Sequence, residues 1–489
     1  MTDLVLDDVT LLTMDPERRI IEDAWIAVSG GRIEQIGTGP SPAAGHRIDG
    51  RGGVAMPGMI STHQHVIDVL LRGGLEQDRS LFDWLVNVYF AGTSVYRPED
   101  CGLAATLTLA EGVRAGITTI TDNWGVNNGD DPGRVAECAE ATLEVYRRSG
   151  MRVLFARMFS DTVPEQWAGV VGTYMRKLPD KALDLDTLTE PLDDALARIE
   201  SLIATHHGSA DGRIQVCPAP IMAQLVSPEG LAGARELAER HNTIVPIHHC
   251  ESPLNARMFP ESGEGIGVTD YLNALGFLSP RTLAAHCVWL DDRDIRLLGT
   301  ADVKVAHCPS CNMFIASGAA PVPRLLAAGL TVGLGTDDAN TSSNVSIMLE
   351  MRQAVLLAKL AAGDPGALTG EKALEMATID GARALGMDEE IGSLEVGKKA
   401  DLVLFDTAAP HWQPRHLLPA TIVYQAHSDD VRTVLVDGEV VLDEREPAFL
   451  GAEEAPVLYE RARRASAEIV ERAGMGPLLA RGWQSQSRV

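Results

Sequence analysis

The sequence is poor in basic residues. Lys and Arg together number 42 against 68 Asp and Glu in 489 residues, which gives a formal net charge of −26. A surface with this excess of negative charge repels phosphate backbones and anionic membranes. The composition therefore disfavours nucleic acids and membrane surfaces as partners, and we expect a neutral or cationic small molecule instead.

Long apolar runs and a cysteine framework are also missing. No uninterrupted stretch reaches the roughly 20 residues that a membrane-spanning helix needs, and the first ten residues lack the basic and apolar segments of a secretory signal. The seven cysteines are odd in number and scattered over a long chain, which is typical of reduced thiols. These absences predict a soluble, cytoplasmic protein.

Short β-rich runs separated by turns occupy both ends of the chain. Leu4–Leu6 is one such run near the start, and Asp401–Phe405 is one near the end. Asp437 and Gly438 stand between two Val-rich runs, which is a strong signature of a tight hairpin. We therefore expect one small β-sandwich domain assembled from both termini.

The middle of the chain alternates short apolar runs with helical segments such as Pro98–Ala115 and Pro228–His241. Strand–helix alternation gives a parallel sheet, and eight such units match an α/β fold of the closed (β/α)8 TIM barrel type. A doubly wound open sheet is the alternative, but no Gly-rich phosphate loop follows the first strand. The eight predicted strands are Met59–His65, Gly116–Asn123, Val153–Met158, Ile214–Pro220, Ile244–Glu251, Leu283–Trp289, Val303–Ser310 and Val332–Asp338.

The predicted domains are a composite β-sandwich from residues 1–56 and 391–450, a metal-dependent barrel from 57–390 and a helical extension from 451–489.

Metal-ligating residue types stand at the carboxyl ends of these predicted strands, where the catalytic groups of such barrels lie. His63 and His65 are two residues apart, so a strand turns both side chains to the same side. His248 lies near the end of the fifth strand, His286 near the end of the sixth and Asp337 near the end of the eighth. Three imidazoles and one carboxylate that leave a position open suit catalytic Zn²⁺, and Fe²⁺ accepts much the same ligands. A lone His-X-His pair would be weak evidence, but ligand types at several strand ends together predict a metal site.

Longer motifs surround these ligands: Met56–His65, Gly116–Thr119, His248–Ser252, Ala285–Cys287 and Gly335–Asp337. They resemble the amidohydrolase superfamily, in its cyclic deaminase branch. Leu71–Gly74, Phe82–Leu85 and Leu374–Arg383 resemble more narrowly the s-triazine hydrolases, which include melamine deaminase and atrazine chlorohydrolase. The likeness runs nearly from end to end of the chain.

The resemblance assigns roles to particular residues. The metal ligands that it implies are His63, His65, His248 and Asp337. It implies that Glu251 shuttles a proton from the attacking water to a ring nitrogen, and that His286 contacts that water or serves as a further ligand. His249 adjoins a ligand, but strand alternation turns it the other way, and we predict a structural role for it. The predicted catalytic residues are Glu251, His286, Asp337 and Asp338.

Asp338 bears on the leaving group. In the resembling pair the deaminase carries an acid at this position and the chlorohydrolase an amide, and an amine needs a proton to depart whereas chloride does not. The alternative role for Asp338 is to cap the following turn. Thr341 matches neither member of the pair well. The predicted substrate contacts are Leu81, Trp84, Asp122, Asn123 and Asn340, with Phe82 as a further ring that could stack; a buried core position is the alternative for Trp84.

The leading hypothesis is a metal-dependent deaminase that replaces an amino group of a triazine, pyrimidine or purine-like ring with hydroxyl. The resemblance implies a homo-oligomer. Dechlorination by the same machinery is the nearest alternative. Hydrolysis of an amide ring is disfavoured because the fourth strand carries no lysine for a two-metal site. An inactive binding protein is disfavoured because every catalytic position is filled.

Overall fold

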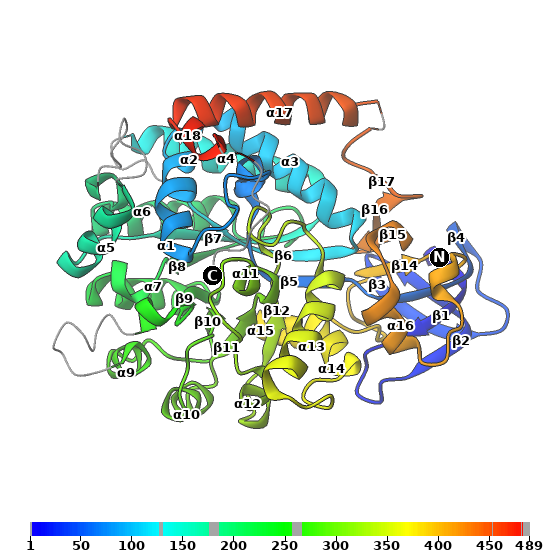
Figure 1. Cartoon of the computed structure of the whole chain (residues 1–489). Coiled ribbons are helices and arrows are strands. Elements are labelled where there is room, and N and C mark those ends of the chain that lie inside the picture. The colour runs from blue at the N-terminus through cyan, green and yellow to red at the C-terminus, as the bar shows by residue number, and fades with distance from the viewer. Residues whose placement is uncertain are drawn as a thin grey trace.

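The centre of the molecule is a barrel of parallel strands (Figure 1). The computed structural model describes residues 2–126, 131–175, 185–256, 267–451, 453–480 and 482. Among these residues the barrel strands are β5 (Met59–His65), β6 (Ile117–Trp124), β7 (Arg152–Phe159), β8 (Ile214–Pro220), β9 (Val245–His249), β10 (Thr282–His286), β11 (Lys304–His307) and β12 (Val332–Leu334), followed by the short β13 (Asp337–Asp338). The predicted TIM barrel is confirmed, and β5 and β8 match their predicted bounds residue for residue.

Two parallel sheets make up the barrel wall, with strand orders β13-β5-β6-β7-β8 and β12-β11-β10-β9. On one side the backbone N–H of His248 donates to the carbonyl of Ile221 at 3.2 Å, which links β9 to the end of β8. On the other side the Thr62 hydroxyl donates to the Leu334 carbonyl at 2.9 Å, which links β5 to β12. The second link joins the first barrel strand, β5, to β12, and the two links together close the ring.

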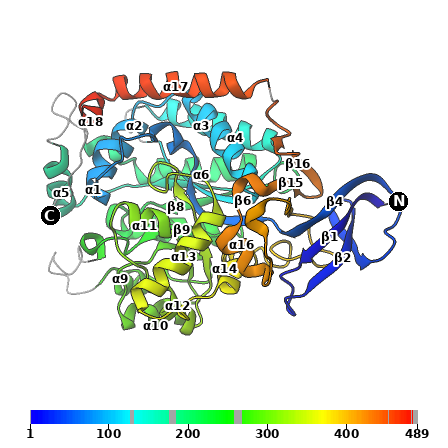
Figure 2. The same ribbon diagram turned by 45° about the vertical axis from the view of Figure 1, so that its right-hand side comes forward.

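Helices cover the outside of the barrel (Figures 1 and 2). One example shows why they begin where they do: the Ser227 hydroxyl accepts a hydrogen bond from the Gly230 N–H, and Pro228 occupies the first turn of α7. The described helices of eight or more residues that follow barrel strands are α3 (Pro98–Arg114), α4 (Pro132–Ser149), α5 (Glu165–Met175), α6 (Leu192–His206), α7 (Pro228–Arg240), α10 (Asp292–Thr300), α13 (Ile347–Ala362) and α14 (Gly370–Ala377). Shorter elements are η1 (Val66–Leu71), α1 (Leu81–Trp84), η2 (Leu85–Phe90), α2 (Ala91–Thr93), η3 (Leu185–Leu188), η4 (Ala223–Leu225), α9 (Val268–Ala274), α11 (Pro309–Phe314), α12 (Val322–Ala327) and α15 (Ile379–Ala384).

Both ends of the chain contribute to a second sheet beside the barrel, as predicted (Figure 2). Its described strands are β1 (Thr2–Leu12), β2 (Ile20–Ser29), β3 (Arg32–Thr38), β4 (Ala44–Pro57), β14 (Leu402–Phe405), β15 (Val431–Val436), β16 (Glu439–Asp443) and β17 (Glu446–Pro447), in the order β17-β16-β15-β14-β4-β1-β2-β3. The β15–β16 hairpin turns at Asp437 and Gly438, as its sequence predicts. The Ala400 N–H donates to the Gly31 carbonyl at 2.9 Å, so the β2–β3 turn meets the segment before β14. The two walls of the predicted sandwich are thus parts of one hydrogen-bonded sheet that curves around its own apolar core.

A buried ion-pair network joins this sheet to the barrel. Arg152, at the start of β7, donates through Nε and Nη2 to Asp401 at 3.1 and 3.2 Å and through Nη2 to Asp437 at 3.0 Å. Arg152 and Asp401 are both buried, and a guanidinium paired in a two-pronged way with carboxylates tolerates burial. The network fixes the sheet against the amino-terminal end of the barrel, away from the mouth.

The charged helix expected near the end of the chain is present as α17 (Ala455–Arg472), and it lies along α3 on the outside of the barrel (Figure 1). The Arg472 guanidinium pairs with Asp100 of α3 at 2.5 Å. The other late elements are η5 (Pro410–Trp412), α16 (Leu418–Gln425), η6 (Ser428–Asp430) and α18 (Gly476–Leu479). Within the described ranges, no helix combines the length and apolar character needed to cross a bilayer.

Candidate metal centre and active site

The ends of strands β5, β9 and β13 bring four ligand-type residues, His63, His65, His248 and Asp337, to the barrel mouth. His65 Nε2 lies 3.2 Å from His248 Nε2 and 3.6 Å from Asp337 Oδ1. His63 Nε2 lies 3.3 Å from the same Asp337 oxygen. Ligand bonds to zinc measure about 2.0–2.2 Å, so donors that share one ion lie about 3–4 Å apart. The structure therefore brings together the ligand set that the sequence predicts.

Backbone carbonyls hold the outer nitrogens of His65 and His248 and settle which nitrogen of each ring carries the proton. His65 Nδ1 lies 2.7 Å from the Asn123 carbonyl, and His248 Nδ1 lies 2.7 Å from the Ile221 carbonyl. A carbonyl can only accept, so each Nδ1 carries the hydrogen and each Nε2 directs a lone pair into the mouth. This arrangement is the usual support of a metal-binding histidine.

His63 tests the fit of an ion most directly. Its Nδ1 contacts the Asn123 side-chain amide at 2.8 Å, whereas its buried Nε2 has no hydrogen-bond partner among the described residues. A buried nitrogen without a partner is costly unless something else satisfies it. A divalent cation among the four donors would satisfy it, so the residues present fit a zinc or iron(II) ion.

The protonation states suit the same role. Burial and the neighbouring His63 lower the pKa of His65 to about 3, and burial holds the pKa of His248 well below its usual range, so both are neutral ligands at pH 7. Burial works to raise the pKa of Asp337, but the nearby His286 and His63 outweigh it and hold that pKa well below the usual range. The set is three neutral imidazoles and one carboxylate.

Backbone geometry at the mouth is unusual. Asp337 and His286 adopt left-handed conformations, with φ of 57° and 70°. Such conformations are unfavourable for residues with a Cβ and persist where the surrounding fold imposes them, often at functional sites. Gly335 explains part of the constraint, because a Cβ there would lie 2.6 Å from the His63 carbonyl oxygen. The close approach of β12 to β5 is what allows Asp337 to reach the histidine pair.

Glu251 and His286 lie side by side next to these donors. His286 Nε2 is 3.8 Å from Glu251 Oε2 and 3.8 Å from Asp337 Oδ2. Burial raises the pKa of Glu251 to about 7, against the smaller opposite effect of His286. A carboxyl group whose pKa is close to neutral can both accept and return a proton at physiological pH.

Asp338 faces a second buried carboxyl group, that of Asp68 in η1. Carboxylate oxygens of the two residues and a nitrogen of His65 lie within 4.8 Å of one another. Burial, Asp337 and Asp68 together raise the pKa of Asp338 well above its usual range, and burial raises the pKa of Asp68 to about 7. The raised pKa of Asp338 therefore places a protonated carboxyl group next to Asp337 at neutral pH.

A small cavity opens onto these groups, and we call it the inner pocket. Its polar lining comprises His65, His248, Glu251, His286, Asp337 and Asp338. The rest of its lining is largely apolar and consists of Leu81, Trp84, Leu85, Tyr89, Met158, Ile221, Met222, Cys311 and Ile315. Of the predicted substrate contacts, Leu81 and Trp84 line it.

The other predicted substrate contacts lie elsewhere. Asp122 accepts from the Val66 N–H at 3.0 Å and from the Tyr146 hydroxyl, so both of its oxygens are used inside the wall. Asn123 supports His63 and His65 rather than lining the pocket. Asn340 is fully buried outside the lining, and Phe82 packs against Trp167 with ring centroids 6.0 Å apart. The described lining of the inner pocket includes none of these four residues, and their contact with a substrate stays a prediction.

Two supporting residues escaped the sequence prediction. Asn312, in α11 (Pro309–Phe314), places Oδ1 at 3.1 Å from His286 Nδ1 and so orients that ring. Asp68 lies three residues beyond His65, a helical spacing from a ligand that could have drawn attention to it. His249, predicted to be structural, contacts the Thr269 hydroxyl at 3.0 Å and does not line the inner pocket.

The chain was compared with known proteins. Residues 54–441 match the model of the amidohydrolase family. The S-triazine hydrolase of Gordonia rubripertincta is 34% identical over 99% of both chains. The 5-methylthioadenosine/S-adenosylhomocysteine deaminase of Pelotomaculum thermopropionicum is 36% identical over 95% of this chain and 98% of its own.

Solved structures agree with this placement. An adenosine deaminase from Xanthomonas campestris with bound zinc superposes with a TM-score of 0.84 at 27% identity, covering 96% of this chain and 99% of that one. The atrazine chlorohydrolase of Arthrobacter aurescens in complex with zinc gives a TM-score of 0.84 at 26% identity, covering 95% and 100%. The match over most of the chain shows that this protein belongs to the amidohydrolase family.

Proposed function

We propose that this hydrolase removes an exocyclic amino group from a nitrogen heteroaromatic ring, replaces it with hydroxyl and releases ammonia. The single observation that carries the proposal is the grouping, at one barrel mouth, of the candidate ligand set, the proton carrier Glu251 and the neighbouring carboxyl groups of Asp68 and Asp338. Relatives named as deaminases and as an S-triazine hydrolase support the same reaction class.

We propose Zn²⁺ as the ion, with Fe²⁺ as the alternative that the donor set also accepts. It would be held by His63, His65, His248 and Asp337. When bound, such an ion lowers the pKa of water toward neutrality and so supplies a nucleophile at pH 7.

Glu251 accepts a proton from the attacking water and returns it to the ring nitrogen next to the carbon under attack. Its raised pKa of about 7 suits both halves of this exchange. His286 is held by Asn312, lies beside Glu251 and orients the attacking water. The apolar lining that includes Trp84 and Leu81 supports the planar faces of the ring.

Asp338 serves the departure of the amine. An amine leaves as ammonia only after it gains a proton, and Asp338, whose pKa is raised by burial and by the nearby Asp337 and Asp68, is the carboxyl group that supplies this proton. Chloride needs no such proton, which is why this carboxyl group favours deamination over dechlorination.

The experiment compares ammonia and chloride release from paired amino- and chloro-substituted triazines and purines, with the wild type and Asp338→Asn. We expect the wild type to release ammonia and the substitution to lower its kcat by about 10²-fold, within the range of general acid catalysis. Dechlorination, where it occurs, should fall far less. Chloride release with no ammonia from any amino-substituted ring would replace deamination by dechlorination as the function.

A further inference from the structure

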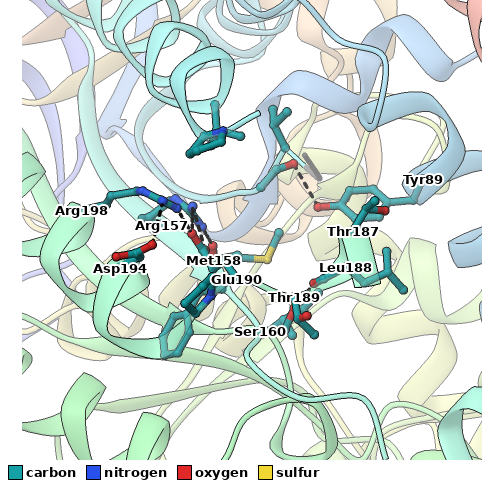
Figure 3. A pocket seen from close by; sticks show the side chains of 17 residues that line it. Tyr89, Arg157, Met158, Ser160, Thr187, Leu188, Thr189, Glu190, Asp194 and Arg198 are labelled. Atoms are coloured by element: carbon teal, nitrogen blue, oxygen red, sulfur yellow. Dashed lines mark hydrogen bonds and ion pairs between the residues drawn. The ribbon is translucent and has the colours of Figure 1, made fainter. Parts of the chain in front are cut away.

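A second cavity adjoins the inner pocket, and we call it the outer chamber. It is larger than the inner pocket. Tyr89, Met158 and Ile221 line both cavities, so they form the boundary between the two. In Figure 3 the Met158 side chain lies between Tyr89 on one side and a group of charged residues on the other.

Tyr89 lies at the boundary and lines both cavities. Its ring lies 6.2 Å from the His65 ring and 5.7 Å from the Trp84 ring, measured between centroids, so it belongs to the wall of the inner pocket. Its hydroxyl donates to the Gly125 carbonyl at 3.2 Å, on the side of the outer chamber. A ligand ring seated near His65 and Trp84 therefore has the outer chamber directly behind Tyr89.

The charged groups of the outer chamber are paired with one another. Glu190 bridges two arginines: its carboxylate is 2.8 Å from the Arg157 guanidinium and 2.6 Å from the Arg198 guanidinium. Arg157 also donates to the neighbouring Met158 carbonyl. Asp194 lies 3.6 Å from Arg198. Two positive charges are thus balanced by two negative ones, and neither arginine presents an uncompensated charge to the cavity.

This balance selects against charge in a ligand. A carboxylate entering the chamber would gain attraction from the arginines but meet Glu190, which already occupies the side of Arg157 that faces Arg198. Like charges brought together at a binding surface oppose binding strongly, whereas a hydroxyl or amide can donate to Glu190 or accept from Arg198 without that repulsion. An uncharged polar substituent fits the chamber best.

We infer that the outer chamber binds a substituent of the heterocyclic substrate, that this substituent is uncharged and hydrogen-bonding, and that Glu190 is the residue that excludes anionic ones. The inference rests on the proposed deamination, since it places the reacting ring in the inner pocket. It implies that the preferred substrates are rings that carry a polar substituent rather than unsubstituted amino-heterocycles.

The test uses two rings, adenine and diamino-1,3,5-triazine, each without an arm, with a carbamoylmethyl arm and with a carboxymethyl arm. The two arms have nearly the same shape and differ in charge, so the ratio of kcat/KM for the amide to that for the acid isolates the charge. For the wild type we expect this ratio to be about 10 or more, and the amide-armed ring to exceed the bare ring. In Glu190→Gln the ratio should fall by about tenfold, because Arg157 and Arg198 are then free to attract the carboxylate.

Two further variants keep the result interpretable. Glu190→Asp retains the negative charge and should retain the preference for the amide. Glu144→Gln removes another glutamate paired with an arginine, Arg147 at 2.8 Å; Glu144 is an exposed residue of α4 that lines neither cavity, and its substitution should leave the ratio unchanged. Circular dichroism melting of each variant checks that it is folded.

The outcomes separate this inference from the proposed function. Equal kcat/KM for bare and amide-armed rings, or a ratio in folded Glu190→Gln equal to that of the wild type, would overturn the assignment of the outer chamber while leaving deamination intact. Absence of ammonia from every ring would overturn the proposed function itself, and the inference with it.

Discussion

The inner pocket and the outer chamber are neighbours built in different ways. Around the inner pocket, His65 and His248 are held by backbone carbonyls at the ends of β6 and β8, and His286 by the buried amide of Asn312. In the outer chamber the charged side chains hold one another, and Asp194 is 60% exposed at its side chain. The first set is fixed by the barrel itself, whereas the second depends on residues of β7, of the segment before α6 and of α6.

The difference suggests a division of labour. Groups positioned by backbone atoms of a parallel barrel change little with the surrounding side chains, so they suit the chemical step. Side chains that pair mainly with each other can be exchanged with less effect on the barrel, so they suit the choice of substrate. Four predictions can break or sharpen this comparison.

The largest effect is expected for loss of a ligand. His65→Ala should lose bound metal and lower kcat by about 10³-fold or more, because the ion supplies several kcal/mol of transition-state stabilisation. His46→Ala, which removes an exposed histidine of β4, is the matched control and should retain both metal and activity. Elemental analysis together with ammonia release measures the effect; a His65→Ala protein with full metal content and full activity would break the assignment.

Glu251→Gln is expected to follow, with a fall in kcat of about 10²–10⁴-fold. In the wild type, kcat should also drop as the pH is lowered through about 7, because burial raises the pKa of Glu251 to about 7 and the protonated carboxyl cannot accept a proton from water. The residual activity of Glu251→Gln should lack this acidic limb. An unchanged pH profile in the variant would remove Glu251 from proton transfer.

Asn312→Ala should have an intermediate effect. It deprives His286 Nδ1 of its acceptor, and loss of a group that orients a metal-site histidine lowers metal affinity or activity by about 10–100-fold. Asn344→Ala, at a half-buried asparagine that donates to the Ser342 carbonyl, is the control and should stay close to wild type. Equal activities of the two variants would show that the ring of His286 needs no such support.

The smallest effect is expected at the boundary between the two cavities. Tyr89→Phe keeps the ring wall but removes the hydroxyl that donates to Gly125, a bond worth about 1 kcal/mol. We expect kcat/KM to change by no more than about threefold and the free energy of unfolding to fall by about that 1 kcal/mol. A loss of activity larger than that of Asn312→Ala would mean that the Tyr89 hydroxyl takes part in the reaction.

Much of the fold follows from patterns that act locally. Alternation of apolar runs and helices predicted the barrel, and β5 and β8 begin and end where the sequence indicates. The Asp437-Gly438 turn likewise gave the β15–β16 hairpin. The walls of the composite domain could not be predicted as one sheet, because the contact between Gly31 and Ala400 joins segments hundreds of residues apart.

The candidate site is likewise only partly predictable from the sequence. The spacing of His63 and His65 fixes both on one side of a strand, so the pair is readable from the sequence. Asp122 and Asn123 end the next strand and looked equally available, yet one bonds Tyr146 inside the wall and the other supports the histidines. Which way a side chain points at a strand end depends on the neighbouring strand, and no local pattern encodes it.

The sequence by itself determined the family of this protein and the residue types of its candidate metal site, because the longer motifs resemble the amidohydrolase superfamily and ligand types stand at predicted strand ends. Only the tertiary structure decided what surrounds that site: the closeness of Asp68 to Asp338, the support of His286 by Asn312, and the outer chamber lined by Glu190. The physical reason is that ligand identity is a property of single residues, whereas burial, charge balance and cavity shape arise only when distant segments pack together.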